Sequence, residues 1–134
     1  MGAEDNIKTV QTLYEAFGRG DVQTIVDNLT DDIDWGAEAA STAAPWYGIR
    51  KGKDAVGAFF TDLGSATEVQ EFTPTTFGSN ETEVFAVVYY RASSRATGKT
   101  TTMNVHHWFK FRGDKVCYWR GSEDTAQTLE ALSE

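Results

Sequence analysis

The second half of the chain consists of four long strand-like stretches with only short turns between them. The stretches are Val69–Phe77, Val84–Ala92, Thr100–Phe111 and Lys115–Ser122. They are rich in β-branched and aromatic residues, and the segments between them carry the Gly, Asn, Ser and Asp residues that favour turns. Because sequential strands joined this closely pair antiparallel, we predict a mostly antiparallel sheet.

Amphipathic helices are predicted before this sheet. The first carries an apolar stripe at three- and four-residue spacing, formed by Ile7, Val10, Leu13, Tyr14 and Phe17. A second short helix follows Asp21, which suits an N-cap, and a third carries the stripe Val56, Phe59, Phe60 and Leu63. Between them, residues 32–35 alternate as a short strand with Ile33 and Trp35 facing inward, and residues 36–45 form a loop. Helices segregated from a sheet in this way predict an α+β fold.

The size of the chain limits it to one domain. Its 134 residues are 40% hydrophobic, which is enough for one core and too little for two. A further short amphipathic turn is expected near the end, with Ala126, Leu129 and Leu132 on one face. We therefore treat residues 1–134 as a single domain.

Charge and cysteine content narrow the possible partners. A net charge of −8 opposes binding to phosphate backbones and anionic bilayers, so neither nucleic acid nor a membrane is an expected partner. The first residues lack the basic and apolar regions of a secretory signal, and Cys117 is the only cysteine. A cytoplasmic location is therefore expected.

Three segments resemble the SnoaL-like branch of the nuclear transport factor 2-like superfamily. They are LYEAFGRGD (13–21), LTDDIDW (29–35) and GIRKGKDAV (48–56), followed by the four strands in the matching order. The resemblance implies a cone in which three N-terminal helices pack on the curved sheet around an internal pocket. Members include polyketide cyclases and isomerases that move protons next to a carbonyl, and relatives form dimers through the outer sheet face.

His107 is the titratable residue on the apolar face of a predicted strand. Side chains alternate along a strand, so His107 points inward with Val105 and Phe109, and His106 points outward. An imidazole in a pocket can act as base, acid or oxyanion donor; a purely structural core histidine is the alternative. Because the two His residues face opposite sides, no metal site is expected, and no other cofactor either.

Two charged residues near the last strand are further site candidates. The resemblance places an acid/base group after this strand, which points to Asp124, although residues 124–127 also read as a helix N-cap. By simple alternation Arg120 shares a face with Val116 and Tyr118. Facing inward it would bind a ligand carboxylate, and facing outward it would be a solvated charge.

Aromatic residues are numerous enough to wall a ligand pocket. Those that we assign to the pocket as substrate-binding residues are Tyr14, Phe17, Trp35, Trp46, Phe59 and Tyr89, with Arg120 as their polar companion. Ordinary core packing is the alternative for each of them. The pocket predicts a small apolar or aromatic ligand as the partner.

Ketosteroid isomerases share this fold, but their catalytic positions fall on different residue types here. Their base position falls on Ala37 and their oxyanion tyrosine on Leu13, while the second oxyanion donor falls on His107. Glu38 and Tyr14 are each one residue away from the required positions. A one-residue shift on a strand turns the side chain to the opposite face, so steroid isomerisation is not expected unless a bulge restores the register.

Two functional hypotheses follow. The first is a cofactor-independent isomerase or cyclase that moves protons on an apolar, oxygen-bearing ring compound, with His107 and Asp124 as acid/base residues. The second is a non-catalytic ligand-binding or dimeric assembly module, with Trp108 and Trp119 exposed on the outer sheet face. A filled cone favours the second, and an open cavity that holds His107 with another polar group favours the first.

Overall fold

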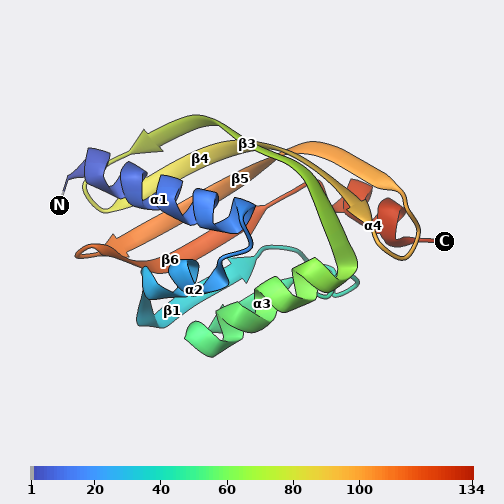
Figure 1. The fold of residues 1–134 in the computed structure, drawn as a ribbon, viewed down its shortest axis with the longest axis horizontal. Coiled ribbons are helices and arrows are strands. Elements are labelled where there is room, and N and C mark those ends of the chain that lie inside the picture. Colours follow the sequence, from blue (N-terminus) through green and yellow to red (C-terminus); the bar gives the residue numbers. More distant parts are fainter. Residues whose placement is uncertain (1) are drawn as a thin grey trace.

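Six strands form one open, strongly curved sheet in the computed structural model, which describes residues 2–134 (Figure 1). The strands are β1 (Leu29–Ala37), β2 (Gly48–Lys51), β3 (Thr67–Ser79), β4 (Glu83–Ser94), β5 (Thr100–Arg112) and β6 (Lys115–Ser122). Their order across the sheet is β2-β1-β6-β5-β4-β3. All neighbours pair antiparallel except β1 and β6, so the prediction of a mostly antiparallel sheet is confirmed.

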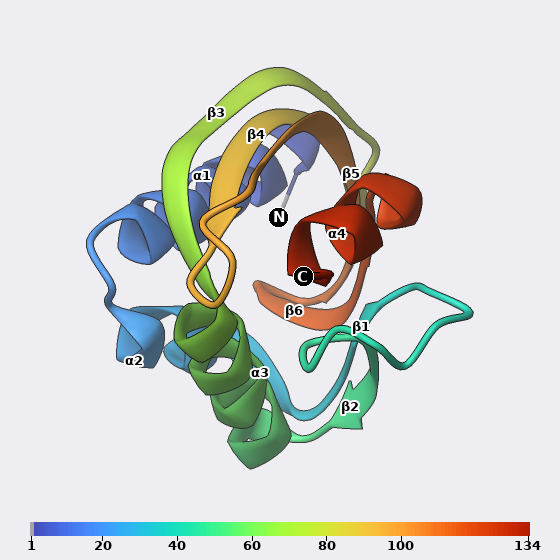
Figure 2. The ribbon, with the colours of Figure 1, turned by 90° about the vertical axis from the view of Figure 1, so that its right-hand side faces the viewer.

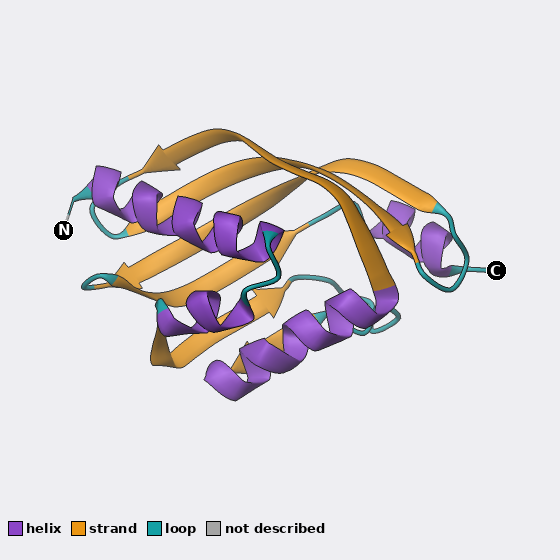
Figure 3. Cartoon of the chain, viewed as in Figure 1, coloured by secondary structure: helices purple, strands orange, loops and turns teal. Residues whose placement is uncertain are grey.

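Three helices lie across the inner side of the sheet (Figure 3). They are α1 (Ala3–Gly18), α2 (Val22–Asp27) and α3 (Lys53–Ala66), and α1 packs on β3 and β4 while α3 packs on β1 and β2. Gly20, with a φ of 73°, takes the left-handed conformation that turns the chain after α1. Asp21 then caps α2 by accepting a hydrogen bond from the Thr24 backbone N–H at 3.1 Å. The predicted α+β fold is confirmed.

The core fills the space between helices and sheet. Val10 of α1, Val56 of α3, Val84 of β4 and Val116 of β6 are completely buried. A fourth helix, α4 (Thr125–Leu132), lies across one end of the curved sheet beside the loop that joins β1 to β2 (Figure 2). No helix within residues 2–134 combines the length and the apolarity needed to cross a bilayer.

Two features of the sheet differ from the sequence-based expectation. A short strand that was not predicted, β2, follows the segment expected to form a loop and pairs with β1 from Asp34–Lys51 to Ala37–Gly48. In β6, Val116 pairs with Phe111 but Tyr118 pairs with Lys110, so one extra residue forms a bulge. The bulge reverses the alternation that follows it, because side-chain direction has a period of two. The expectation that Trp119 is exposed was therefore wrong: Trp119 faces inward and is 6% exposed.

Candidate functional site

A cavity of about 100 Å³ lies between the helices and the inner face of the sheet. Most of its wall is aromatic: Tyr14, Phe17, Trp35, Trp46, Phe59, Phe60, Phe72, Tyr90, Phe109 and Trp119. Five of the six aromatic residues predicted for the pocket are among them. Tyr89 is not, because Val84, Ala86 and Val88 place the even-numbered side chains of β4 inward, and Tyr90 lines the cavity in its place.

A tyrosine and a histidine meet inside this cavity. The Tyr14 hydroxyl of α1 lies 2.7 Å from Nδ1 of His107 on β5. Burial, with a smaller contribution from the neighbouring His106, lowers the pKa of His107 to about 3. Burial also raises the pKa of Tyr14 far above its usual value. Both side chains are therefore uncharged at neutral pH, and they form a polar pair in an apolar wall.

The proton positions of this pair decide what it offers a ligand. A phenol can both donate and accept, and a neutral imidazole has one donor and one acceptor nitrogen. When His107 carries its proton on Nδ1, it donates to the Tyr14 oxygen, and the Tyr14 hydrogen is free for an oxygen atom in the cavity. In that arrangement Tyr14 donates a hydrogen bond to the ligand while its own oxygen accepts one from His107, which strengthens it as a donor.

Glu123, which the sequence reasoning missed, is the carboxylate that lines the cavity. Its Oε1 accepts a hydrogen bond from Trp46 Nε1 at 3.2 Å, and its Oε2 accepts one from the Tyr47 hydroxyl at 3.1 Å. The Thr128 hydroxyl of α4 also donates to Oε2. These three donors fix the orientation of the carboxylate at the end of the cavity near α4. Because the β6 bulge places Trp119 and Gly121 on the inner face, alternation along the strand places Glu123 on that face as well.

The two charged candidates near β6 lie outside the cavity. Asp124 is exposed and caps α4, since its Oδ1 accepts from the Gln127 backbone N–H at 3.2 Å. Arg120 faces the outer side, where its guanidinium pairs with Asp34 Oδ1 at 3.0 Å and lies 4.3 Å from the centre of the Tyr118 ring. The bulge before Trp119 causes this outward orientation. The structure thus supports the N-cap alternative for Asp124 and places Arg120 away from any ligand in the cavity.

Trp35 and Trp119 form the most closely stacked part of the wall. Their ring centroids are 4.3 Å apart with an interplanar angle of 28°. The indole N–H of Trp35 is buried and has no acceptor among the described residues. An unpaired buried donor is costly, so this position favours a group that can accept from it.

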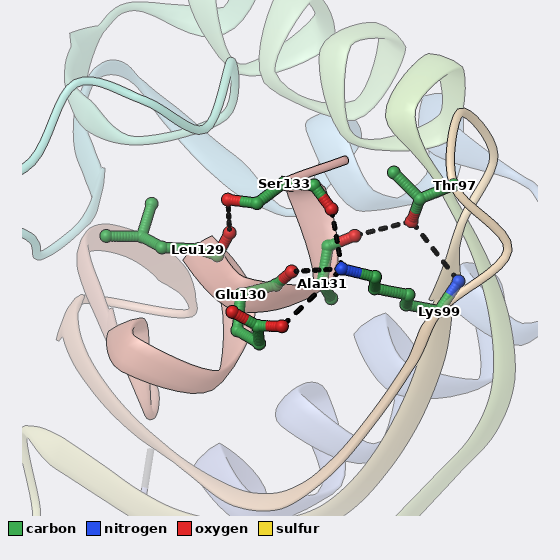
Figure 4. A network of polar contacts seen from close by, with 6 residues as sticks. All are labelled: Thr97, Lys99, Leu129, Glu130, Ala131 and Ser133. Carbon is green, nitrogen blue, oxygen red and sulfur yellow. Dashed lines mark hydrogen bonds and ion pairs between the residues drawn. The ribbon is translucent and has the colours of Figure 1, made fainter.

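The helix α4 is tied to the turn between β4 and β5 (Figure 4). The Thr97 hydroxyl donates to the Ala131 carbonyl at 2.5 Å. Lys99 Nζ donates to the Ser133 carbonyl at 2.7 Å and pairs with Glu130 at 3.5 Å. Because Thr128 of the same helix holds Glu123, these contacts also hold the carboxylate in place. Across residues 2–134, no three His, Cys, Asp or Glu side chains gather closely enough to bind a metal ion.

Gly121 is required by the packing of the cavity wall. A Cβ atom there would lie 2.5 Å from Cζ2 of Trp119 and 3.4 Å from Cδ2 of His107. We expect Gly121→Ala to lower the free energy of unfolding by about 1–3 kcal/mol, because the rigid Trp119 ring would have to move. Urea denaturation measures the change. Gly57→Ala in α3 is the matched control, since a Cβ there meets nothing within 4 Å and helix propensity favours alanine. Equal stability of Gly121→Ala and wild type would contradict this packing role.

The comparisons with known proteins agree with this architecture. A solved nuclear transport factor 2-like protein of unknown function from Burkholderia pseudomallei superposes with a TM-score of 0.90 at 22% identity, covering 97% of this chain and 98% of its own. TerC, co-crystallised with polyporic acid, superposes with a TM-score of 0.84 at 17% identity, and the match covers 97% of this chain and 99% of TerC. A candidate polyketide cyclase from Xanthomonas campestris pv. campestris superposes with a TM-score of 0.79 at 17% sequence identity, and the match covers 98% of each chain. No curated protein matches the chain. The family model of the SnoaL-like domain matches residues 10–119, and the chain therefore belongs to the SnoaL-like family.

Proposed function

We propose that this protein is a cofactor-independent isomerase or cyclase that moves a proton on a small, mostly apolar ring compound bearing an oxygen. Tyr14, supported by His107, binds the oxygen, and Glu123 takes the proton from carbon. The observation that carries the proposal is the Tyr14–His107 hydrogen bond of 2.7 Å inside an aromatic cavity that also contains a carboxylate. The name of the solved candidate polyketide cyclase is consistent with it.

The chemistry requires the two polar groups to act on one molecule. When a base removes a proton next to a carbonyl, negative charge develops on the carbonyl oxygen, and a fixed donor stabilises that charge. Tyr14 can supply the donor because its raised pKa keeps it protonated. Glu123 can hold the proton and return it to another carbon of the same ring. The assignment replaces Asp124 by Glu123 and changes His107 from an acid/base residue to the partner of Tyr14.

Isomerisation of cyclohex-3-enone to cyclohex-2-enone tests this function. The proton leaves C2 for Glu123, the electrons pass through the dienolate, and the proton returns at C4, so the product has the same atoms. Wild type should accelerate the reaction over buffer, and Tyr14→Phe should lower the rate by about 10²–10³-fold, which is typical for loss of one oxyanion donor. Ultraviolet absorbance of the conjugated product measures both rates. No acceleration by wild type would overturn the proposal. Equal rates for wild type and Tyr14→Phe would show that Tyr14 does not stabilise the oxyanion.

Assembly through the outer sheet face is the second function that a specific observation favours. Phe85 on that face is 45% exposed and lies beside Trp108, with ring centroids 6.3 Å apart. The cavity with His107, Tyr14 and Glu123 favours catalysis over assembly alone, but the two are compatible.

We expect a homodimer that buries this face, and Phe85→Lys should shift it toward monomer, because a charge would be buried in an apolar contact. Light scattering at micromolar concentration gives the mass of each protein. A wild type of monomer mass would contradict this prediction.

A further inference from the structure

The cavity carries a single charged side chain at neutral pH. Its lining, among the described residues, includes Glu123 but neither Lys nor Arg. His107 is neutral, because its pKa is lowered to about 3. Tyr14 and Tyr90 stay protonated, because burial raises the pKa of each hydroxyl. A ligand therefore meets one negative charge and no positive charge.

Two arginines lie near the cavity wall, but each is paired with a carboxylate outside it. The Arg50 guanidinium lies 5.8 Å from the centre of the Phe59 ring and is 2.8 Å from Asp62. Arg120 pairs with Asp34 on the outer face. Neither belongs to the lining, so neither is placed to neutralise an anion in the cavity.

The Glu123 carboxylate keeps an unused acceptor position on Oε1. A carboxylate has about four lone-pair positions, and Trp46, Tyr47 and Thr128 occupy three of them. Oε1 receives only the Trp46 bond, which leaves one position on that oxygen. An N–H or O–H group fits this position, whereas a second acceptor does not.

The aromatic wall adds to the same preference. The faces of aromatic rings carry partial negative charge and attract cations, most strongly for indole. Trp35, Trp46 and Trp119 supply three indoles to the lining. An anion would place its charge beside these rings and Glu123, where the effective dielectric constant is lower than in bulk water and the repulsion is stronger.

We propose that Glu123 selects ligands by charge: the cavity takes neutral or cationic one-ring compounds, among them those with an N–H or O–H group beside Glu123, and rejects the matching anions. This inference rests on the proposed function, because it concerns the same cavity, and it adds the compound class. Amines, amidines, amides and phenols fit, and carboxylates do not. The competing view is that Glu123 only ties Trp46, Tyr47 and α4 together.

Three probes of nearly identical shape test the proposal. Benzamidinium, benzamide and benzoate share a ring and a planar end group but carry a positive, a zero and a negative charge. At pH 7.5 we expect wild type to bind benzamidinium about 10-fold tighter than benzamide and benzoate about 100-fold weaker than benzamide, as expected for charges in a partly desolvated site. Calorimetry gives the Kd values, and tryptophan fluorescence reports binding in the cavity.

Glu123→Gln should abolish this ranking of affinities, so that the Kd of benzoate lies within about 10-fold of the Kd of benzamide. Asp124→Asn is the matched control, because it removes the same charge one residue away in solvent while Asn still caps α4, and it should keep the wild-type order. Equal affinities of wild type for the three probes would overturn the inference and leave the cavity as a ligand site. An unchanged order in a folded Glu123→Gln variant would overturn it as well. If none of the probes bound to wild type, the inference would fail together with the small-molecule site.

Discussion

Glu123→Gln should slow the isomerisation of cyclohex-3-enone by about 10²–10⁴-fold, the usual contribution of a positioned general base. Gln has nearly the size of Glu, and its amide oxygen in the place of Oε2 can still accept from Tyr47 and Thr128, so that only the Trp46 hydrogen bond is lost from this part of the wall. It cannot take a proton from carbon. The loss should therefore lie in kcat, with a smaller change in KM.

The control for this experiment is the neighbouring carboxylate. Asp124→Asn removes a negative charge next to Glu123 but leaves the α4 cap and the cavity lining intact, so its rate should match that of wild type. If Asp124→Asn lost the activity and Glu123→Gln kept it, the proton acceptor would be Asp124, as the family resemblance implied. Thermal unfolding of both variants separates a chemical effect from a loss of fold.

Most elements of the fold could be predicted because each leaves a periodic pattern in the sequence. The stripe from Ile7 to Phe17 specifies α1, and the inward alternation of Val105, His107 and Phe109 was read from β5 alone. The strand β2 was missed because four largely exposed residues next to a loop give no such pattern. Its existence depends on pairing with β1, which is a tertiary contact.

The site was predicted only in part because one bulge decides several orientations. The extra residue in β6 sets the directions of Trp119, Arg120 and Glu123, and it arises from pairing with β5 rather than from local sequence. Tyr89 was preferred to Tyr90 for a different reason. Both faces of β4 are apolar there, since Phe85 and Val87 lie outside and Val84 and Val88 inside, so hydrophobicity alone does not identify the inner face.

Acidification should reveal the neutral histidine in the cavity wall. The folded pKa of His107 is about 3, whereas an unfolded histidine has a pKa of about 6.5. Between these values the unfolded chain binds a proton that the folded chain does not, so stability is complete above pH 6.5 and falls as the pH is lowered. The slope approaches about 1.4 kcal/mol per pH unit, and we expect a loss of about 2.5 kcal/mol between pH 6.5 and pH 4.5.

Carboxylates act in a lower window and can be separated from this effect. Hydrogen bonds lower the pKa of Asp21, Asp32 and Glu83, most strongly from Thr24, Arg112 and Trp108 respectively. A carboxylate with a lowered folded pKa contributes stability that is lost only as the pH falls below its unfolded value, which is about 4. Urea unfolding from pH 6.5 to 4.5 therefore reports mainly on His107.

His107→Asn isolates the contribution of the imidazole. The Asn amide lies near the position of Nδ1 and does not titrate, so this variant should start less stable at pH 7 but lose little more down to pH 4.5. His106→Gln is the matched control, because His106 is exposed on the opposite face of β5, and it should keep the wild-type slope. If His107→Asn and wild type had the same slope, His107 would already be accessible to protons in the folded state. The cavity would then be wet enough to weaken the electrostatic effects that Tyr14 and Glu123 require.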